Sequence, residues 1–600
     1  MRYTSCQVEL DLYDTTANQD SNLSVDNIQD FCDINSIKKQ TVIQKIATCE
    51  DDYFLLDGSF SFIDEPSTND YGYMSKKFTS KIESSFSSNH SSAGITFHFW
   101  ETIPKAIKLT FLNNGSIVSQ KTVYPSLEKC ERVSSQYAEL QFNTDFIFSI
   151  GSRLCISQNV CMGYEFFADV DAENYDHMII ELDGGDRYVR INSIDYGAKL
   201  NYGEEYKRKV KSCKVTEQID PISSELPISQ SKLEVIDTEN LFDITNPKSY
   251  YKYLQKRQTF KLFETINNEK RLIATHYLKE WSQTKQMLAS FDLQDVIGSM
   301  NDSTFYGGIY TDRTVKSLID DVMNDFGLED YIVDEELADI TLTGYLGITT
   351  HRQALQQIAF ACGGCVKTSR SNGIVIFKPN YDTSGIVDSN RKLISKAHEI
   401  KQKDLVTGVL VVAHDYQLVD KLEELYKGDF IEGTYLITFN NPCANLSISS
   451  GQILECNCNY AKIKVPNGQI VVKGNKYEDH KVEYTFKISE LPSAANENIL
   501  RIENATLINK ANAQLRAKKI YEIKQYRLEH SLFIITEDES VANMYAVRSN
   551  DGYAPVLFTK METDLTGGFL STIEGIGYAL RTVDYYKTGK ELYAGEEGII

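Results

Sequence analysis

The chain of 600 residues is built largely from short runs in which apolar and polar side chains alternate, often closed by a two-residue turn signal. Ile95–Trp100 and Ile107–Phe111 alternate in this way, and Asn114-Gly115 follows them. Alternation puts successive side chains on opposite faces of a strand, and Asn-Gly accepts the positive φ angles of a tight hairpin. Similar signals stand at Asn372-Gly373 and Asp551-Gly552. The pattern predicts a mainly β protein with a β-sandwich in its first third.

Two segments change to a helical period. Val315–Phe326 places apolar residues three or four positions apart and is followed by Gly327, a residue typical of the position after a helix. His351–Cys362 repeats this spacing, and Thr350 with Gln353 forms a capping box at its start. The region around these two segments is therefore predicted to be a compact α+β module between β-rich parts.

Composition limits the classes of function. Hydrophobic residues make up 42% of the chain, enough for several cores at this length. The 62 basic and 84 acidic side chains give a net charge of −22. This balance argues against a protein that grips nucleic acid, because phosphate contacts need a basic face. The acidity either repels passing DNA or simply keeps the protein in solution.

The sequence carries no secretion or membrane signal. Its start, Met1–Cys6, leads into a polar stretch, and no window approaches the roughly 18 apolar residues of a membrane span. The twelve Cys are scattered and are interpreted as reduced core residues. Together these features predict synthesis in a cytoplasm.

The motif Cys362-Gly363-Gly364-Cys365 is the one that most suggests chemistry. A CxxC motif can be a redox pair or half of a zinc site. A redox pair stands at a helix N-terminus, where the helix dipole lowers the thiol pKa, whereas this pair follows a predicted helix. Zinc would need two more ligands, and Cys456 and Cys458 are candidates with an unusual spacing. We favour a Gly-Gly helix stop with small core thiols, with no metal and no cofactor.

No catalytic set emerges from the remaining residues. The nine His are dispersed without a ligand pair, and the acidic clusters Asp183–Asp186 and Asp334–Asp339 are interpreted as solvated loops or calcium-tolerant turns. Trp100 is the candidate carbohydrate-binding residue, because an exposed Trp stacks on a sugar ring, although a core Trp only packs. We therefore predict no enzyme, and no catalytic or metal-binding residue.

Several stretches between about 205 and 595 share one likeness. They are Asp220–Ser229, Leu241–Pro247, Tyr253–Gln258, Tyr277–Trp281, Ala289–Gly298, Thr304–Gly308, Thr350–Ala359 and Glu562–Phe569. These stretches resemble the hub proteins encoded in Firmicutes phage and prophage tail modules, which are similar to the contractile-phage central hub and to siphophage tail-associated proteins. The resemblance covers about two-thirds of the chain, and its motifs are long but not catalytic.

The resemblance implies a fold and a role. The hub has two small β-barrels like tail-tube subunits, joined by small α+β domains, and three copies present six barrels to the tube. The implied protein is a homotrimer at the tail tip or baseplate of a virion, where it closes the tail tube and opens for DNA passage. The implied partners are the distal tail or tail tube protein, the tape measure protein, and a tail fibre or receptor-binding protein; DNA would pass through the lumen without specific binding. The chain ends at Ile600 without a peptidase or fibre extension, which favours a hub without enzymatic activity.

The first third carries a looser likeness. Phe60–Phe62, Ile95–Phe99 and Ile191–Gly197 resemble the galactose-binding-like sandwiches found in front of such hubs. This part either binds sugar or only packs on neighbours. Alternative functions are therefore a carbohydrate-binding host-adhesion protein, the hub of a DNA-free phage-tail-like bacteriocin, or a cell-wall hydrolase for which no acid/base pair is found.

Pattern and resemblance together divide the chain into five parts. The charged, aperiodic stretch Lys199–Arg208 marks the main boundary. The predicted parts are an N-terminal arm (1–50), a β-sandwich (51–203), a first hub β-barrel (204–299), an α+β insert (300–394) and a second hub barrel (395–600). The last part contains an inserted β-domain at about 431–500 and a long helix at about 505–526, with Asn504 as its N-cap.

Overall fold

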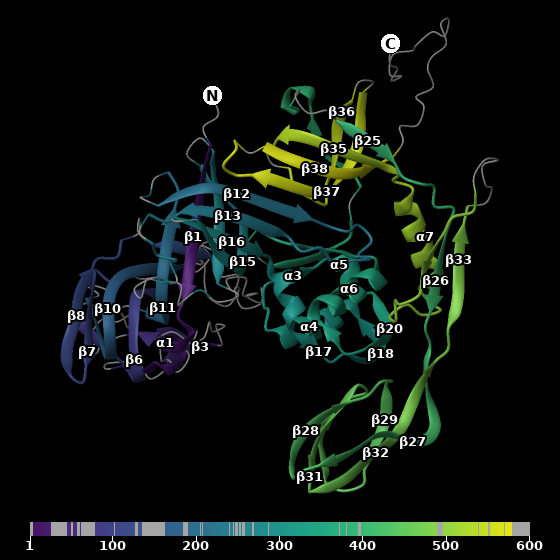
Figure 1. Ribbon diagram of the computed structural model, residues 1–600, viewed down its shortest axis with the longest axis horizontal. Coiled ribbons are helices and arrows are strands. Elements are labelled where there is room, and N and C mark those ends of the chain that lie inside the picture. Colours follow the sequence, from purple (N-terminus) through teal and green to yellow (C-terminus); the bar gives the residue numbers. More distant parts are fainter. Residues whose placement is uncertain are drawn as a thin grey trace, which may run out of the picture. The chain divides into compact units, whose positions relative to one another are not determined.

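The computed structural model describes most of the chain after the first hundred residues and parts of the chain before them (Figure 1). The described residues are 4–25, 45–61 with gaps, 79–100, 103–126, 130–134, 162–183 and 190–578, the last with short gaps that lie mainly at 244–257, 371–372, 394–397 and 489–495. The chain divides into two compact units. The N-terminal unit comprises Glu9–Asn201 and Pro247–Gln258, and the C-terminal unit comprises Met1–Val8, Tyr202–Asn246 and Thr259–Ile600.

Strands dominate both units, which confirms the prediction of a mainly β protein. The elements up to residue 202 are β1 (Thr4–Tyr13), α1 (Thr15–Asp20), β2 (Asn22–Val25), β3 (Lys45–Cys49), β4 (Asp52–Leu56), β5 (Phe60–Ser61), β6 (Thr79–Trp100), β7 (Ala106–Asn113), β8 (Ser116–Val123), β9 (Glu131–Ser134), β10 (Met162–Asp183) and β11 (Arg190–Tyr202).

The N-terminal unit is organised around two long antiparallel strands, β6 and β10. β10 pairs with β6 along most of its length and also with β7 and β9, while β6 also pairs with β2 and β11. The predicted Asn114-Gly115 hairpin is confirmed, with β7 and β8 antiparallel on either side of it and both turn residues at positive φ. Inward-facing residues such as Phe97, Leu109 and Ile180 form one core.

A continuous run of paired strands crosses the C-terminal unit. Its strands are β12 (Lys209–Gln218), β13 (Gln230–Ile236), β14 (Thr259–Ile266), β15 (Glu269–Lys285), β16 (Leu288–Gln294), β24 (Thr383–Val387), β25 (Glu399–Gln402), β35 (Leu528–Ile535), β36 (Met544–Ser549), β37 (Gly552–Asp564) and β38 (Leu570–Gly577).

The pairing order joins two groups of strands that are far apart in the sequence. The first group follows the order β14, β15, β16, β13, β12. β12 then pairs with β37, whose other partners β36 and β38 continue to β24 and to β35 and β25. Among the strand pairings of the described residues, none closes either group into a barrel, so the two barrels remain predictions.

An α+β module lies between these groups in the sequence (Figure 1). Its elements, with the short helices before it and the 3-10 turn after it, are α3 (Val296–Ser299), η4 (Met300–Asp302), β17 (Thr304–Phe305), β18 (Gly308–Thr314), α4 (Val315–Phe326), β19 (Tyr331–Val333), α5 (Glu335–Ala338), β20 (Thr341–Leu346), β21 (Thr349–Thr350), α6 (His351–Cys362), β22 (Cys365–Thr368), β23 (Ile374–Phe377) and η5 (Ser389–Arg391). We define the α+β module as Thr304–Phe377.

Both helices predicted in the α+β module are confirmed. α4 begins after Thr314 and ends at Gly327, which takes the left-handed conformation with φ 80°. α6 carries the capping box of Thr350 and Gln353 and ends at Gly363, with φ 81°. The apolar stripes of the two helices pack into one core with β26 and α7.

A β-domain is inserted in the chain within the second strand group, between β25 and β35. Its six strands are β27 (Tyr416–Phe430), β28 (Gly433–Thr438), β29 (Cys443–Ile448), β30 (Gln452–Cys456), β31 (Tyr460–Val465) and β32 (Gly468–Asp479). They form two three-stranded sheets, β27–β32–β29 and β28–β31–β30, around a core of their own. We call Tyr416–Asp479 the inserted domain. The strands that lead into and out of it are β26 (Gly408–Ala413) and β33 (Val482–Lys487), which pair with each other, and β34 (Ile499–Ile502) pairs with β26.

Two local predictions differ from the structure. The long helix is α7, Ala513–Lys524, so it starts eight residues after the predicted start at Ala505. The side chains of Asn509 and Asn512 accept hydrogen bonds from the Ala511 and Asn509 backbone N–H groups, and such local bonds compete with helix formation. The acidic stretch Asp334–Asp339 is not a loop but contains α5, because Asp334 caps it and Leu337 is buried.

The polar lead-in was interpreted as an arm or an irregular segment, with an extra strand or two as the alternative, and the structure shows strands there. It contains β1, in which Val8, Leu10 and Leu12 alternate with polar residues and are buried. That alternation was the signal missed in the sequence. Of the other acidic cluster, Asp183 ends β10 and the residues 184–186 lie outside the described residues.

Candidate functional site

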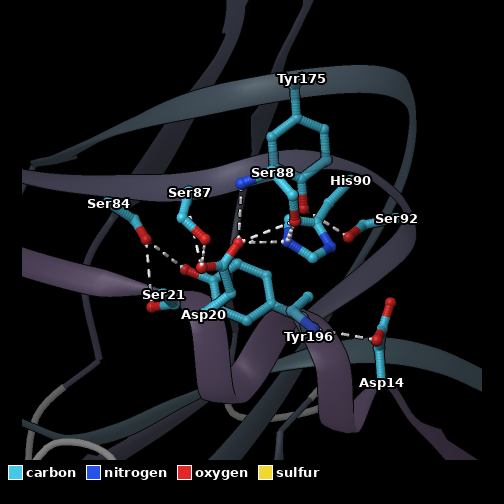
Figure 2. A network of polar contacts seen from close by, with 11 residues as sticks. Asp14, Asp20, Ser21, Ser84, Ser87, Ser88, His90, Ser92, Tyr175 and Tyr196 are labelled. Atoms are coloured by element: carbon cyan, nitrogen blue, oxygen red, sulfur yellow. Dashed lines mark hydrogen bonds and ion pairs between the residues drawn. The ribbon is translucent and has the colours of Figure 1, made fainter.

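A network of polar side chains joins α1 to β6 in the N-terminal unit (Figure 2). Asp20, the last residue of α1, accepts hydrogen bonds from the backbone N–H groups of Ser87 and Ser88, each at 3.0 Å, and from both serine hydroxyls. Nε2 of His90 lies 2.8 Å from Oδ2 of Asp20. Hydrogen bonds from Ser87 and then from His90 hold the pKa of Asp20 far below its usual range.

A second set of hydroxyl groups extends this network into the core. The Tyr196 hydroxyl donates to Ser84 at 2.9 Å, and Ser84 lies 3.1 Å from the Ser21 hydroxyl. Tyr175 and Ser92 pair at 2.6 Å. These groups are buried among aromatic rings, so each needs the partner that the network supplies.

The network contains Ser, His and Asp but lacks the geometry of a nucleophilic triad. A triad places the serine on one ring nitrogen of the histidine and the carboxylate on the other. Here Ser88 and Asp20 both lie on Nε2 of His90, at 3.2 and 2.8 Å. The carboxylate is also saturated by five donors. The arrangement therefore fastens the end of α1 to β6 and has no free base.

Trp100, the predicted carbohydrate-binding residue, is the last residue of β6 and pairs with Gly163 of β10. Its side chain lies outside what the structure describes. Sugar binding by this residue therefore stays a prediction.

In the C-terminal unit, a buried loop receives polar contacts from several elements. We call Asp220–Ser229, between β12 and β13, the junction segment. Its Ile222 and Leu226 belong to the core formed by α4 and α6. Within the segment, the Asp220 carboxylate accepts hydrogen bonds from the Ile222 and Glu225 backbone N–H groups. These local bonds stabilise the turn of the loop.

Three side chains from distant helices donate to the carbonyl groups of the junction segment. Arg352 of α6 donates from Nε to the Leu226 carbonyl at 2.9 Å. Gln356 of α6 donates to the Ser223 carbonyl at 2.6 Å, and Arg516 of α7 donates to the Ile222 carbonyl at 3.1 Å. The Arg516 guanidinium is buried over the Phe360 ring, and burial lowers its pKa to about 10.

Asp295 closes the other end of the junction segment. Its Oδ2 accepts from the Ser229 backbone N–H at 3.0 Å and from the Thr368 hydroxyl at 3.3 Å, and its Oδ1 accepts from the Gly298 backbone N–H at 2.9 Å. The side chain is buried among neutral donors, and burial raises its pKa to about 6. Asp295 thereby ties β16, the junction segment and β22 to one carboxylate.

Of the two cysteines of the CxxC motif, Cys365 contacts the junction segment and Cys362 bonds its own helix. The Cys365 thiol donates to the Asp220 carbonyl at 3.4 Å, and the Cys362 thiol donates to the Ala359 carbonyl of its own helix. Burial raises the pKa of Cys365 to about 12 and also raises that of Cys362, so both thiols stay protonated. In the part of the chain that the structure describes, no cluster of three metal-ligating side chains occurs.

A groove of about 470 Å³ lies beside the junction segment, between β25, the end of α7, β35 and β38. Its charged residues are largely matched with one another. Lys403 pairs with Glu529 at 2.6 Å, and Glu574 pairs with Lys560 at 2.8 Å. The groove therefore offers no face of a single charge to a ligand.

Sequence reasoning missed the central residues of both sites. Asp20 and His90, and likewise Asp295 and Arg516, are single polar residues whose partners are distant in the chain; the bond from Arg516 to Ile222 spans 294 positions. Asp295 was part of the stretch Ala289–Gly298 that carried the family resemblance, and this was the only signal that pointed to it. No helix among the described residues has both the length and the apolar character needed to cross a bilayer.

Comparisons with known proteins give similar structures but no sequence relative. No family model matches the chain, and no curated protein matches it in sequence. The tail protein from Neisseria meningitidis MC58 has a TM-score of 0.40 and 11% identity, over 63% of this chain and 94% of that chain. The 43 kDa tail protein of prophage MuSo2 from Shewanella oneidensis has a TM-score of 0.38 and 11% identity, over 62% of this chain and 97% of that chain. The prophage tail protein gp18 from Listeria monocytogenes EGD-e has a TM-score of 0.35 and 9% identity, over 61% of this chain and 87% of that chain. TM-scores this low do not establish a shared fold.

Proposed function

We propose that the chain is a structural, non-enzymatic protein of a phage tail or a tail-like particle, and that it is the hub at the tail tip. In this role three copies close the tail tube, bind the tube or distal tail protein on one side, and anchor the tape measure protein and the fibres. The hub opens when DNA passes. The sequence resemblance between about 205 and 595 is the starting point of the proposal.

One observation carries the proposal beyond the resemblance. Three stretches that share it, Asp220–Ser229, Ala289–Gly298 and Thr350–Ala359, meet at one place, the junction segment, through Asp295, Arg352 and Gln356. β12, the strand directly before the junction segment, pairs with β37 and so joins the two strand groups. A rigid connection between two strand groups is what a hub needs if each group is to sit under one tube subunit.

A trimer follows from this arrangement as part of the proposal. Two strand groups in each chain give six in three chains, so a three-fold assembly can meet a six-fold tube without breaking the symmetry of either. Pairing with neighbouring copies would also cover strand edges such as β25, which has four exposed residues.

Immuno-electron microscopy of the parent particle tests the proposal. Antibodies raised against the C-terminal unit should bind the tail at its distal end, and particles made without this chain should lack a closed tip. Labelling along the whole tube, on the head, or on no particle would overturn the proposal.

A further inference from the structure

The inserted domain is connected to the rest of the C-terminal unit by two chain crossings. They are His414-Asp415 and Asp479-His480, which we call the hinge. The buried His414 ring has Nδ1 at 2.8 Å from Asp479 Oδ2 and Nε2 at 2.8 Å from the Glu503 carbonyl. The His480 backbone N–H donates to the Asp415 carbonyl at 2.9 Å. Both crossings are therefore fixed to each other and to the body of the unit.

Directly beyond the hinge, the two-stranded ribbon of β27 and β32 is irregular. Its register shifts between Leu418 and Leu422 and again between Glu424 and Tyr426. Leu418 and Leu422 are largely exposed, so few packing contacts stiffen this part. Bulges interrupt the ladder of hydrogen bonds and let a ribbon bend. A cavity of about 280 Å³ lies between the hinge and β18, next to this ribbon.

Away from the hinge, a turn of the inserted domain contacts the α+β module. We call Asn457–Tyr460 the latch turn. Asn459, which is 1% exposed, donates from Nδ2 to the Tyr306 and Leu346 carbonyls at 2.7 and 3.0 Å, and its Oδ1 accepts from the Tyr345 hydroxyl at 2.7 Å.

Three further contacts flank Asn459. Asn457 donates to the Gly307 carbonyl at 3.1 Å, and the rings of Tyr460 and Tyr306 lie 4.7 Å apart. The Ile309 backbone N–H points to the Cys458 thiol. The latch turn thus meets the stretch Thr304–Gly308, one of those that carried the family resemblance, through amide, hydroxyl and thiol groups without charge.

The two parts contact each other through hydrogen bonds and two pairs of tyrosine rings, Tyr306–Tyr460 and Tyr345–Tyr416, whereas each part has its own apolar core. The core residues of the inserted domain and those of the α+β module form separate clusters with no residue in common. Separating the two parts therefore leaves both apolar cores intact, and each neutral group of the latch turn exchanges its partner for water at small net cost. Elements that move in proteins are held by contacts of this kind.

We propose that the inserted domain swings as a folded body about the hinge and that Asn459 is the latch that holds it on the α+β module. This inference rests on the contacts of the inserted domain and does not depend on the proposed tail function. It gives the chain two states, latched and released, whose balance a binding partner could shift.

Three native cysteines of the inserted domain can report the two states. Cys456 is exposed, Cys458 lies in the latch turn, and Cys443 is 2% exposed in the domain's own core. Burial raises the pKa of Cys458 to about 11 and that of Cys443 to about 12, so both react slowly while they are covered. Release uncovers Cys458 and leaves Cys443 covered.

The experiment follows alkylation of the full-length chain by N-ethylmaleimide, with each cysteine read by tandem mass spectrometry. In the parent protein Cys456 should react fast and Cys458 slowly. Asn459→Ala should speed Cys458 roughly tenfold, because the latch loses three hydrogen bonds, and should leave Cys443 unchanged. Tyr345→Phe removes one of those three bonds and should speed Cys458 roughly two- to threefold.

Asn467→Ala is the matched control. Asn467 also lies in the inserted domain, but its side chain bonds only the Glu432 backbone N–H of the same domain, so Cys458 should react at the parent rate. The proposal is overturned if Cys458 is unaffected by both Asn459→Ala and Tyr345→Phe. It is equally overturned if Cys443 speeds up together with Cys458, since the domain would then unfold and not swing.

Discussion

The junction segment and the latch turn are both loops held by buried polar contacts, yet they are built differently. The junction segment receives charged donors, Arg352 and Arg516, and places Ile222 and Leu226 in the largest apolar core of the unit. The latch turn is held by neutral groups, chiefly Asn459, and shares no core residue with the surface that it contacts.

This difference indicates that the connection through the junction segment is permanent and that the connection through the latch turn is not. Pulling the junction segment out would leave the buried Arg516 guanidinium and the half-buried Arg352 guanidinium without these acceptors and would open a core, and both changes cost several kcal/mol. When the latch turn is released, its neutral groups form hydrogen bonds with water instead. The chain thus combines a fixed connection between its strand groups with a releasable connection to its inserted domain.

Arg516→Ala should have the largest effect. The substitution removes a buried guanidinium that donates to the Ile222 carbonyl and covers the Phe360 ring, so the free energy of unfolding of the C-terminal unit should fall by about 3 kcal/mol. Urea unfolding measures this change. Lys518→Ala, at an exposed position on the same helix, is the control. Equal midpoints for the two variants would show that the contact of Arg516 with the junction segment stabilises the unit no more than an exposed side chain does.

Asp295→Asn should change how stability depends on pH. Burial raises the pKa of Asp295 to about 6 in the folded state, so the folded chain binds this proton more tightly than the unfolded chain does. The free energy of unfolding therefore falls as pH rises from about 4 to about 6, and the variant should lack this component, which is on the order of 2 kcal/mol.

Urea unfolding at pH 4.5 and pH 7 of the parent and the variant measures this component. Asp292→Asn, at an exposed position of β16, the strand directly before Asp295, should leave the pH dependence of the parent intact. Parallel pH profiles for the parent and Asp295→Asn would show that Asp295 does not titrate in the junction.

Gly307→Ala should disturb the surface that the latch turn contacts. Gly307 has φ 61°, and a Cβ there would approach the Leu346 carbonyl oxygen to 2.2 Å, which costs about 1–3 kcal/mol of local strain. Because Leu346 belongs to the same module, the urea midpoint of the C-terminal unit should fall, and Cys458 should be alkylated faster because Asn457 bonds the Gly307 carbonyl. Gly308→Ala, where the nearest atom would be at 3.4 Å, should change neither measurement. An unchanged midpoint together with an unchanged alkylation rate for Gly307→Ala would show that this turn does not position the latch contact.

Asp20→Asn should have the smallest effect, because its network lies partly at the surface of the N-terminal unit. Hydrogen bonds lower the pKa of Asp20, so its contribution to stability is present above the ordinary carboxyl range near pH 4 and is lost as the pH falls below it. The variant should lower the thermal midpoint of this unit slightly at pH 7 and by a smaller amount at pH 2, where part of the contribution has been lost. Asp169→Asn, at a highly exposed carboxylate, is the control, and an equal effect from it would deny Asp20 a special role.

Local signals in the sequence predicted local structure well. The hairpin at Asn114-Gly115 and the helix with the capping box of Thr350 and Gln353 depend on neighbours in the chain, and both are confirmed. The helix predicted from Ala505 is present but begins later, at Ala513, for a local reason that the apolar spacing did not show, the side-chain bonds of Asn509 and Asn512.

The two connections could not be predicted, because each depends on residues that meet only after folding. Nothing next to Arg516 in the sequence indicates that it bonds Ile222, and nothing next to Asn459 indicates Tyr306 or Leu346. A buried polar residue has no sequence pattern of its own, since its partner set is defined by topology. The resemblance pointed to the right stretches, but only the contacts gave them a physical role.

The most direct test of the central claim is the mass of the purified chain in solution. A tail hub that places two strand groups per chain under a six-fold tube should assemble as three copies, with about three times the chain mass of 68.1 kDa. Light scattering coupled to size-exclusion chromatography, repeated over a tenfold range of concentration, measures this mass. A trimer at the upper concentrations is the predicted result, and a stable monomer, dimer or tetramer throughout would contradict the account.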